Sequence, residues 1–177
     1  LLLAIDSERY TPFMPAKQPS EILTIANHIL GTGQLSLAKF LFITADTTNQ
    51  LSAFQVQEYF IYLLQRIDLS RDIHSYTKTT IDTLDYSGTS LNEGSKVVIA
   101  AYGDIKRNLC TDVLPIFKDL KIFINPQLAM PGVICISAPK FESYDVTNQQ
   151  ISLLNQQLQL EIEKLDSCPL VIICRAE

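Results

Sequence analysis

The segment GQLSLAKFLFITAD (residues 33–46) decides the fold of this chain. Its second half, KFLFITA (residues 39–45), is continuously apolar, which is typical of a strand covered on both faces, as in parallel sheets. Asp46 ends the run, and the turn residues after it are of types that cap helices. The segment therefore predicts a buried strand followed by a helix over residues 51–67.

Apolar runs and helical stripes alternate along the rest of the chain. Further strands are predicted over residues 1–6, 73–77, 96–102, 133–137 and 170–174, and further helices over 20–30, 112–120 and 148–165. We expect Pro115 to disturb the helix over 112–120, because proline removes a donor and clashes with the preceding turn. The alternation predicts an α/β fold: a mostly parallel sheet with helices packed on it.

The beginning and the end of the chain resemble each other. LLAIDSERY from Leu2 resembles VICISAPKF from Val133, and FLFITAD from Phe40 resembles LVIICRA from Leu170. Many βαβ units share such patterns, so the likeness is either an imperfect internal repeat or a coincidence. We predict a single α/β domain over residues 1–177, with a first half at about 1–102 and a partial second repeat at about 133–177.

Composition limits the function classes. The net charge is -5 and the basic residues are scattered, which argues against nucleic acid as a partner. No apolar run reaches the roughly 18 residues of a membrane span. The four cysteines form no CxxC pair, which favours reduced thiols and a cytoplasmic location.

The residues themselves carry no recognisable catalytic or metal-binding motif. The chain contains no GxGxxG, Walker, GxSxG or HExxH pattern. His28 and His74 have no nucleophile in local register, and Asp82, Asp85 and Glu93 are interpreted as a polar, solvated turn. Lys96 in EGSK stands at a strand entry, where a solvated lysine is expected, and a lysine placed near an anion is the alternative. We therefore predict no catalytic residue and no metal ligand in this chain.

Four motifs nevertheless stand in a recognisable order: GQLSLAKF, QRIDLSRDI, TIDTLD and EGSKVVIA. Their order and spacing resemble the C-terminal domain of the UbiD-type decarboxylases, the polyprenyl-hydroxybenzoate carboxy-lyases and their relatives. The matching residues are Gly33, Gln34, Leu35, Lys39, Phe40, Asp46, Arg66, Asp68, Arg71, Asp72, Asp82, Leu84, Asp85, Gly94, Ser95 and Lys96. Three residues depart from the family pattern: Ala38, Thr80 and Ala100. The resemblance therefore says less about the subfamily and the substrate than about the fold.

The resemblance implies a function for a longer protein. It implies non-oxidative decarboxylation of an aromatic or unsaturated acid, such as a polyprenyl-hydroxybenzoate in quinone biosynthesis, with prenylated FMN and a divalent metal such as manganese. In that family the flavin, the metal and the catalytic residues belong to an upstream domain. By the resemblance, this chain binds no cofactor, is inactive alone, closes the cleft and supports homo-oligomerisation.

The resemblance also indicates which residues face the cleft. Residues 34–40 and 80–84 are expected there, with Gln34 and Lys39 as the polar candidates for a cofactor or substrate cleft. The first residue is Leu rather than Met, so we expect a piece of a longer protein whose upstream flavin-binding domain is its partner. A truncated repeat further predicts an exposed sheet edge at residues 170–174 and self-association. The alternative is a free-standing α/β interaction module without catalysis.

Overall fold

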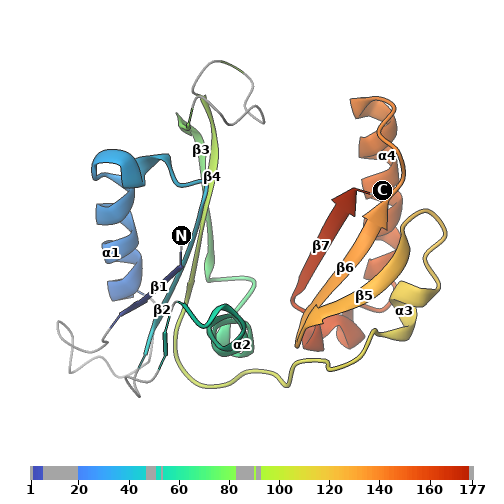
Figure 1. The fold of residues 1–177 in the computed structure, drawn as a ribbon, viewed down its shortest axis with the longest axis horizontal. Coiled ribbons are helices and arrows are strands. Elements are labelled where there is room, and N and C mark those ends of the chain that lie inside the picture. Colours follow the sequence, from blue (N-terminus) through green and yellow to red (C-terminus); the bar gives the residue numbers. More distant parts are fainter. Residues whose placement is uncertain are drawn as a thin grey trace. The chain divides into compact units, whose positions relative to one another are not determined.

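The computed structural model describes residues 2–5, 20–46, 51–52, 54–82, 90 and 93–175. The chain divides into two compact units, Leu1–Lys106 and Arg107–Glu177 (Figure 1). Each unit has an apolar core of its own. Both units combine strands with helices, so the predicted α/β class is confirmed. That residues 1–177 form a single domain stays a prediction. None of the helices in the described ranges combines the length and apolar character needed to cross a membrane.

The first unit is a sheet with helices on it. Its elements are β1 (Leu2–Ile5), α1 (Ser20–Leu30), the 3₁₀ helix η1 (Gly33–Leu37), β2 (Phe40–Ala45), α2 (Val56–Arg66), β3 (Ile73–Thr80) and β4 (Glu93–Ala101). Among the described residues the strand order is β1-β2-β4-β3. β1, β2 and β4 run parallel, and β3 runs antiparallel to β4.

The two helices of this unit cover opposite faces of the sheet (Figure 1). On the α1 face, Ile22 and Ala26 belong to one buried cluster with Ile43 of β2 and Val98 of β4. On the α2 face, the hydroxyl of the fully buried Tyr59 donates to the carbonyl oxygen of Phe42 at 2.8 Å. Alternate residues of β2 thus enter both cores, which explains why its sequence is continuously apolar.

The second unit has a smaller sheet. Its elements are α3 (Pro115–Lys118), β5 (Ile124–Met130), β6 (Val133–Ala138), α4 (Tyr144–Gln159), the 3₁₀ helix η2 (Ile162–Ser167) and β7 (Leu170–Arg175). The strand order in the described residues is β5-β6-β7. Phe117, Ile134, Ile136 and Leu154 are central to its buried cluster.

The prediction of a mostly parallel sheet was wrong, because both sheets are mixed. In the first unit β3 pairs antiparallel with β4, its successor along the chain. In the second unit β5 and β6 form an antiparallel pair joined through Pro131 and Gly132, and only β6 and β7 are parallel. A connection of two residues joins antiparallel strands, whereas parallel strands need a long crossover.

Strand β5 was not predicted. It contains Pro126, and Asn125 has a φ of 52°, in the left-handed region that non-glycine residues rarely adopt. Proline is uncommon inside strands and is confined to edges, and β5 is an edge strand. The half-buried Pro126, Leu128 and Met130 still alternate with exposed residues, and a Pro-Gly turn follows them. That alternation was the available signal.

Three helix predictions are corrected at their ends. α2 begins at Val56 rather than residue 51, and Phe54, placed in the predicted helix, is 97% exposed. α4 begins at Tyr144 rather than residue 148, because the Ser143 side chain accepts from Val146 N and caps the helix. Pro115 does not disturb α3 but opens it, since proline suits the first helical position.

Both units contain a parallel strand–helix–strand segment, β1-α1-β2 and β6-α4-β7. This shared order does not confirm the predicted repeat, because βαβ units in general have it. The repeat stays a hypothesis.

Candidate functional site

The two segments expected to face a cleft lie at one end of the sheet in the first unit. β2 and β4 are parallel with Phe40 opposite Val97, so their amino ends share an edge. η1 directly precedes β2 at this edge, and Thr80 pairs there with Glu93, the first residue of β4. Residues 83–84 of the expected loop lie outside the described residues. We name this edge, formed by residues 33–40, 80–82 and 93–96, the amino edge.

The two predicted cleft residues both belong to the amino edge. Gln34 is exposed within η1, and Lys39 is half-buried just before β2. The Lys39 carbonyl oxygen accepts a hydrogen bond from Val97 N at 2.9 Å, which holds this segment to β4. That these side chains face a cofactor or substrate stays a prediction.

Lys96 is the residue that sequence reasoning misread. The expectation of a solvated side chain was wrong, because Lys96 is only 4% exposed. Its Nζ donates to the carbonyl oxygen of Ser36, and burial lowers the pKa of Lys96. Lys96, Val98 and Ala100 are all buried and alternate along β4, so the period-two pattern already placed Lys96 on the inward face.

The motif glycines have structural reasons at this edge. Gly33 opens η1 with a φ of +47°, a conformation that glycine adopts without a Cβ penalty. A Cβ on Gly94 would lie 2.7 Å from Cδ1 of Ile81, which is 2% exposed. The glycine therefore lets β4 approach the segment that follows β3.

The RIDLSRD motif closes the turn between α2 and β3. The Asp72 carboxylate, whose side chain is fully buried, accepts from Arg71 Nε at 2.6 Å and Nη2 at 3.0 Å, and from Asp68 N at 2.8 Å. Hydrogen bonds from Ser70 and Lys106 hold the pKa of Asp68 well below its usual range. Arg71 and Ser70 belong to the turn itself and Lys106 reaches it from the segment after β4, so this motif has a structural role.

The described residues offer no metal centre: no group of three or more His, Cys, Asp or Glu among them lies close enough to hold an ion. Asp82 is half-buried, Glu93 accepts from Ser90 Oγ at 2.9 Å, and Asp85 lies outside the described residues. His28 is exposed, and the buried Nε2 of His74 has no hydrogen-bond partner among the described residues. The described members of this set therefore belong to no donor group for a divalent metal.

Comparison with known proteins defines the class. Residues 1–101 match the family model for the 3-octaprenyl-4-hydroxybenzoate carboxy-lyase C-terminal domain. This match covers more than half of the 177 residues, so the chain belongs to this UbiD C-terminal domain family. The resemblance carried by the four motifs is thereby confirmed.

Individual relatives are similar over parts of the chain. A protein of Chlamydia pneumoniae, named as a subunit of 4-hydroxybenzoate decarboxylase, is 41% identical over 109 residues, covering 62% of this chain and 17% of the relative. An uncharacterized protein of Chlamydia caviae is 34% identical over 156 residues, covering 86% of this chain and 24% of the relative. The chain thus spans a quarter or less of the length of these curated relatives.

Among solved structures, the chain is similar to the vanillic acid decarboxylase of Sedimentibacter hydroxybenzoicus in its open form. The identity is 14% and the TM-score 0.47, with 90% of this chain and 26% of that chain covered.

Proposed function

We propose that this chain is the C-terminal part of a decarboxylase that releases CO₂ non-oxidatively from an aromatic or unsaturated acid. The family match over residues 1–101 is the observation that carries the proposal. The name of the Chlamydia pneumoniae relative, which makes it part of a 4-hydroxybenzoate decarboxylase, supports hydroxybenzoates as the first substrates to test. A polyprenyl-hydroxybenzoate of quinone biosynthesis belongs to this class.

Within that enzyme the amino edge forms a wall of the cleft, and catalysis is carried elsewhere. An upstream domain of the same protein holds prenylated FMN and a divalent metal such as manganese, and the chain alone is inactive. Gln34 contacts the cleft from η1 and Lys39 from the start of β2. The buried Lys96 holds η1 in place through the Ser36 carbonyl, which gives the exposed Gln34 a firm support.

The enzyme assembles from more than one chain in the cytoplasm. β7 is an edge strand of its sheet in the described residues, and Ile172 and Ile173 on it are 40% and 41% exposed. An apolar edge strand is a ready template for pairing, which supports a homo-oligomer. That the Chlamydia pneumoniae relative is named as one subunit of its enzyme supports an additional partner chain.

The experiment uses the full-length protein encoded by the gene that contains this chain. CO₂ release from 4-hydroxybenzoate is measured for the parent, Gln34→Ala and Lys39→Ala, with the exposed Lys121→Ala as the control. We expect each cleft variant to lower kcat/KM by up to about tenfold, because one hydrogen bond contributes about 0.5–1.5 kcal/mol. Flavin content and melting temperature should stay those of the parent.

Two outcomes contradict the proposal separately. Unchanged kcat/KM in both cleft variants would remove Gln34 and Lys39 from the cleft while leaving the decarboxylase intact. A full-length protein that carries no flavin and releases no CO₂ from any aromatic or unsaturated acid tested would reject the enzyme. The alternative, an α/β interaction module without catalysis, would then stand.

A further inference from the structure

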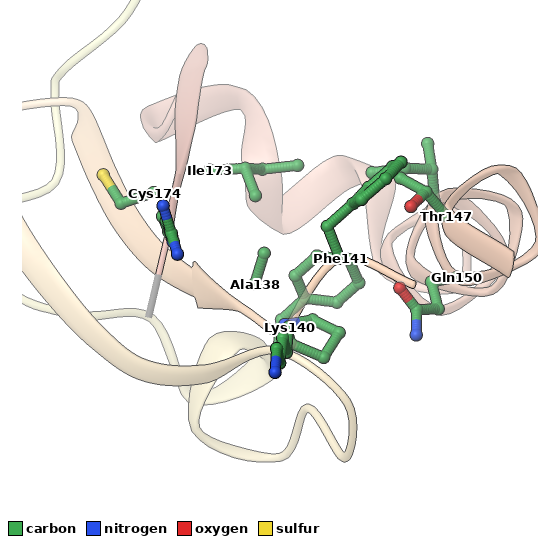
Figure 2. A pocket seen from close by; sticks show the side chains of 11 residues that line it. Ala138, Lys140, Phe141, Thr147, Gln150, Ile173 and Cys174 are labelled. Carbon is green, nitrogen blue, oxygen red and sulfur yellow. The ribbon is translucent and has the colours of Figure 1, made fainter. Parts of the chain in front are cut away.

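A pocket of about 520 Å³ opens in the second unit, outside residues 1–101 that match the family model (Figure 2). It lies at the carboxyl ends of the parallel strands β6 and β7, where Ala138 and Arg175 are register partners. Thr147, Gln150 and Ile151 of α4 form its other wall. A crevice at the carboxyl ends of parallel strands is where α/β proteins commonly bind ligands. Its volume falls within the range of about 300–1,000 Å³ that holds small organic molecules.

Most of the wall is apolar. The apolar lining residues are Phe123, Ala138, Pro139, Phe141, Ile151 and Ile173. Phe141 is 60% exposed, and its ring packs edge-to-face on Tyr144 with centroids 5.4 Å apart, which orients it. An apolar ligand body would therefore meet a prepared aromatic and aliphatic surface.

The charged residues of the pocket have one sign. Lys140 and Arg175 both line it, and none of its eleven lining residues carries a carboxylate, although the chain as a whole has a net charge of -5. No ion pair with another described residue involves Lys140 or Arg175. Thr147 and Gln150 add neutral hydrogen-bonding groups. The pocket thus offers two cations beside an apolar wall.

We propose that this pocket binds a small organic anion with an apolar body. Lys140 and Arg175 pair with the anionic group, and the wall around Phe141 and Ile173 contacts the body. Both parts of the ligand are needed, because exposed cations bind a bare anion weakly. All eleven lining residues lie in the second unit, outside the segment that carries the proposed cleft residues Gln34 and Lys39.

Cys174 is exposed at the edge of the pocket, between the lining residues Ile173 and Arg175, and serves as a neighbouring reporter. The rate of its alkylation by iodoacetamide is measured by mass spectrometry in the full-length protein. Cys110 lies in the same unit outside the lining, on a separate tryptic peptide, and is the internal control. The probe is 8-anilinonaphthalene-1-sulfonate. N-phenyl-1-naphthylamine supplies its rings without the sulfonate, and sodium sulfate supplies an anion without rings.

We expect the sulfonate probe, at about four times its dissociation constant, to slow alkylation of Cys174 by up to about fivefold, the limit that is reached if only the free protein reacts. Cys110 should react unchanged, and the neutral compound and sulfate should protect less. The double variant Lys140→Gln/Arg175→Gln should lose the protection, and Lys121→Gln should keep it.

Equal protection by the neutral compound, protection of Cys110 to the same degree, or protection retained in the double variant would overturn the proposal. If Cys174 does not react even without a probe, fluorescence of the bound sulfonate decides, and equal binding to the parent and the double variant would overturn the proposal. If the double variant does not fold, the protection of Cys174 in the parent protein by the sulfonate probe, the neutral compound and sulfate still tests the proposal.

Discussion

The buried ammonium of Lys96 in β4 donates a hydrogen bond to the main-chain carbonyl oxygen of Ser36 in η1, 60 residues earlier in the chain. This contact joins the two motifs GQL and GSK, whose order is typical of the family. It also holds the segment that presents Gln34 at the amino edge.

The first prediction concerns the pH dependence of this contact. Burial lowers the pKa of Lys96 from its usual 10.5, so between the lowered value and 10.5 the unfolded chain binds more protons than the folded chain. The free energy of unfolding should therefore rise with pH across that window, and Lys96→Met should remove this rise. Urea unfolding at several pH values between 7.5 and 10 measures it, with Lys121→Met as the exposed control. Equal pH slopes for Lys96→Met and the parent would refute the assignment.

A second prediction tests the close approach at Gly94. Gly94→Ala places a Cβ 2.7 Å from Ile81 Cδ1 and 3.2 Å from its Cγ2, and should destabilise the chain by about 1–3 kcal/mol as overpacking does. Ile81→Val takes away Cδ1 and should restore part of that loss in the double variant. Chemical unfolding of the parent, the two single variants and the double variant gives the coupling free energy between the two positions. Strict additivity of the two single effects would show that the predicted clash does not occur.

A third prediction separates a buried carboxylate from a surface ion pair. Arg71→Ala leaves the fully buried Asp72 carboxylate without its two guanidinium hydrogen bonds, and should cost about 1–3 kcal/mol. Lys164→Ala breaks the ion pair with Glu161, in which the Lys164 side chain is 71% exposed and the Glu161 side chain 39%. This change should lower the free energy of unfolding by less than about 0.5 kcal/mol. Thermal unfolding monitored by circular dichroism compares the two. Similar costs would mean that burial of Asp72 has no energetic consequence.

The fourth prediction concerns thiol reactivity. Burial, and next the neighbouring Cys110 thiol, raise the pKa of Cys168 to about 12. Because the thiolate is the nucleophile, Cys168 at pH 8.5 should hold roughly a thousandfold less thiolate than an ordinary thiol and resist iodoacetamide. Alkylation is followed by mass spectrometry in buffer and in 8 M urea, where Cys168 should react like an exposed thiol. Rapid alkylation of Cys168 in the folded chain would show that the thiol is accessible.

Predictions from the sequence were reliable where a local pattern suffices. The apolar runs of β2, β6 and β7 were read at nearly their observed bounds, because a buried strand needs apolar residues in a continuous stretch. β5 was missed because Pro126 and a left-handed Asn125 interrupt its pattern. The start of α4 was placed four residues late, because the Ser143 cap sets it.

The candidate site was predicted only in part. Gln34 and Lys39 were named from the motif, and the sheet brings their segment to the amino edge. Lys96 was taken for a solvated residue, because a charged residue at a strand entry is usually exposed. The pocket with Lys140 and Arg175 was not foreseen, since its walls come from two strand ends and a helix.

The sequence by itself determined the α/β class, most of the strands and helices, and the family, because these depend on local periodicity and on motifs in a fixed order. Only the tertiary structure decided the strand directions, the contact between Lys96 and Ser36, and the presence of both Lys140 and Arg175 in the lining of one pocket. Each of these depends on contacts between residues far apart in the chain. Packing brings such residues close together and excludes water from between them, and both effects strengthen their interaction.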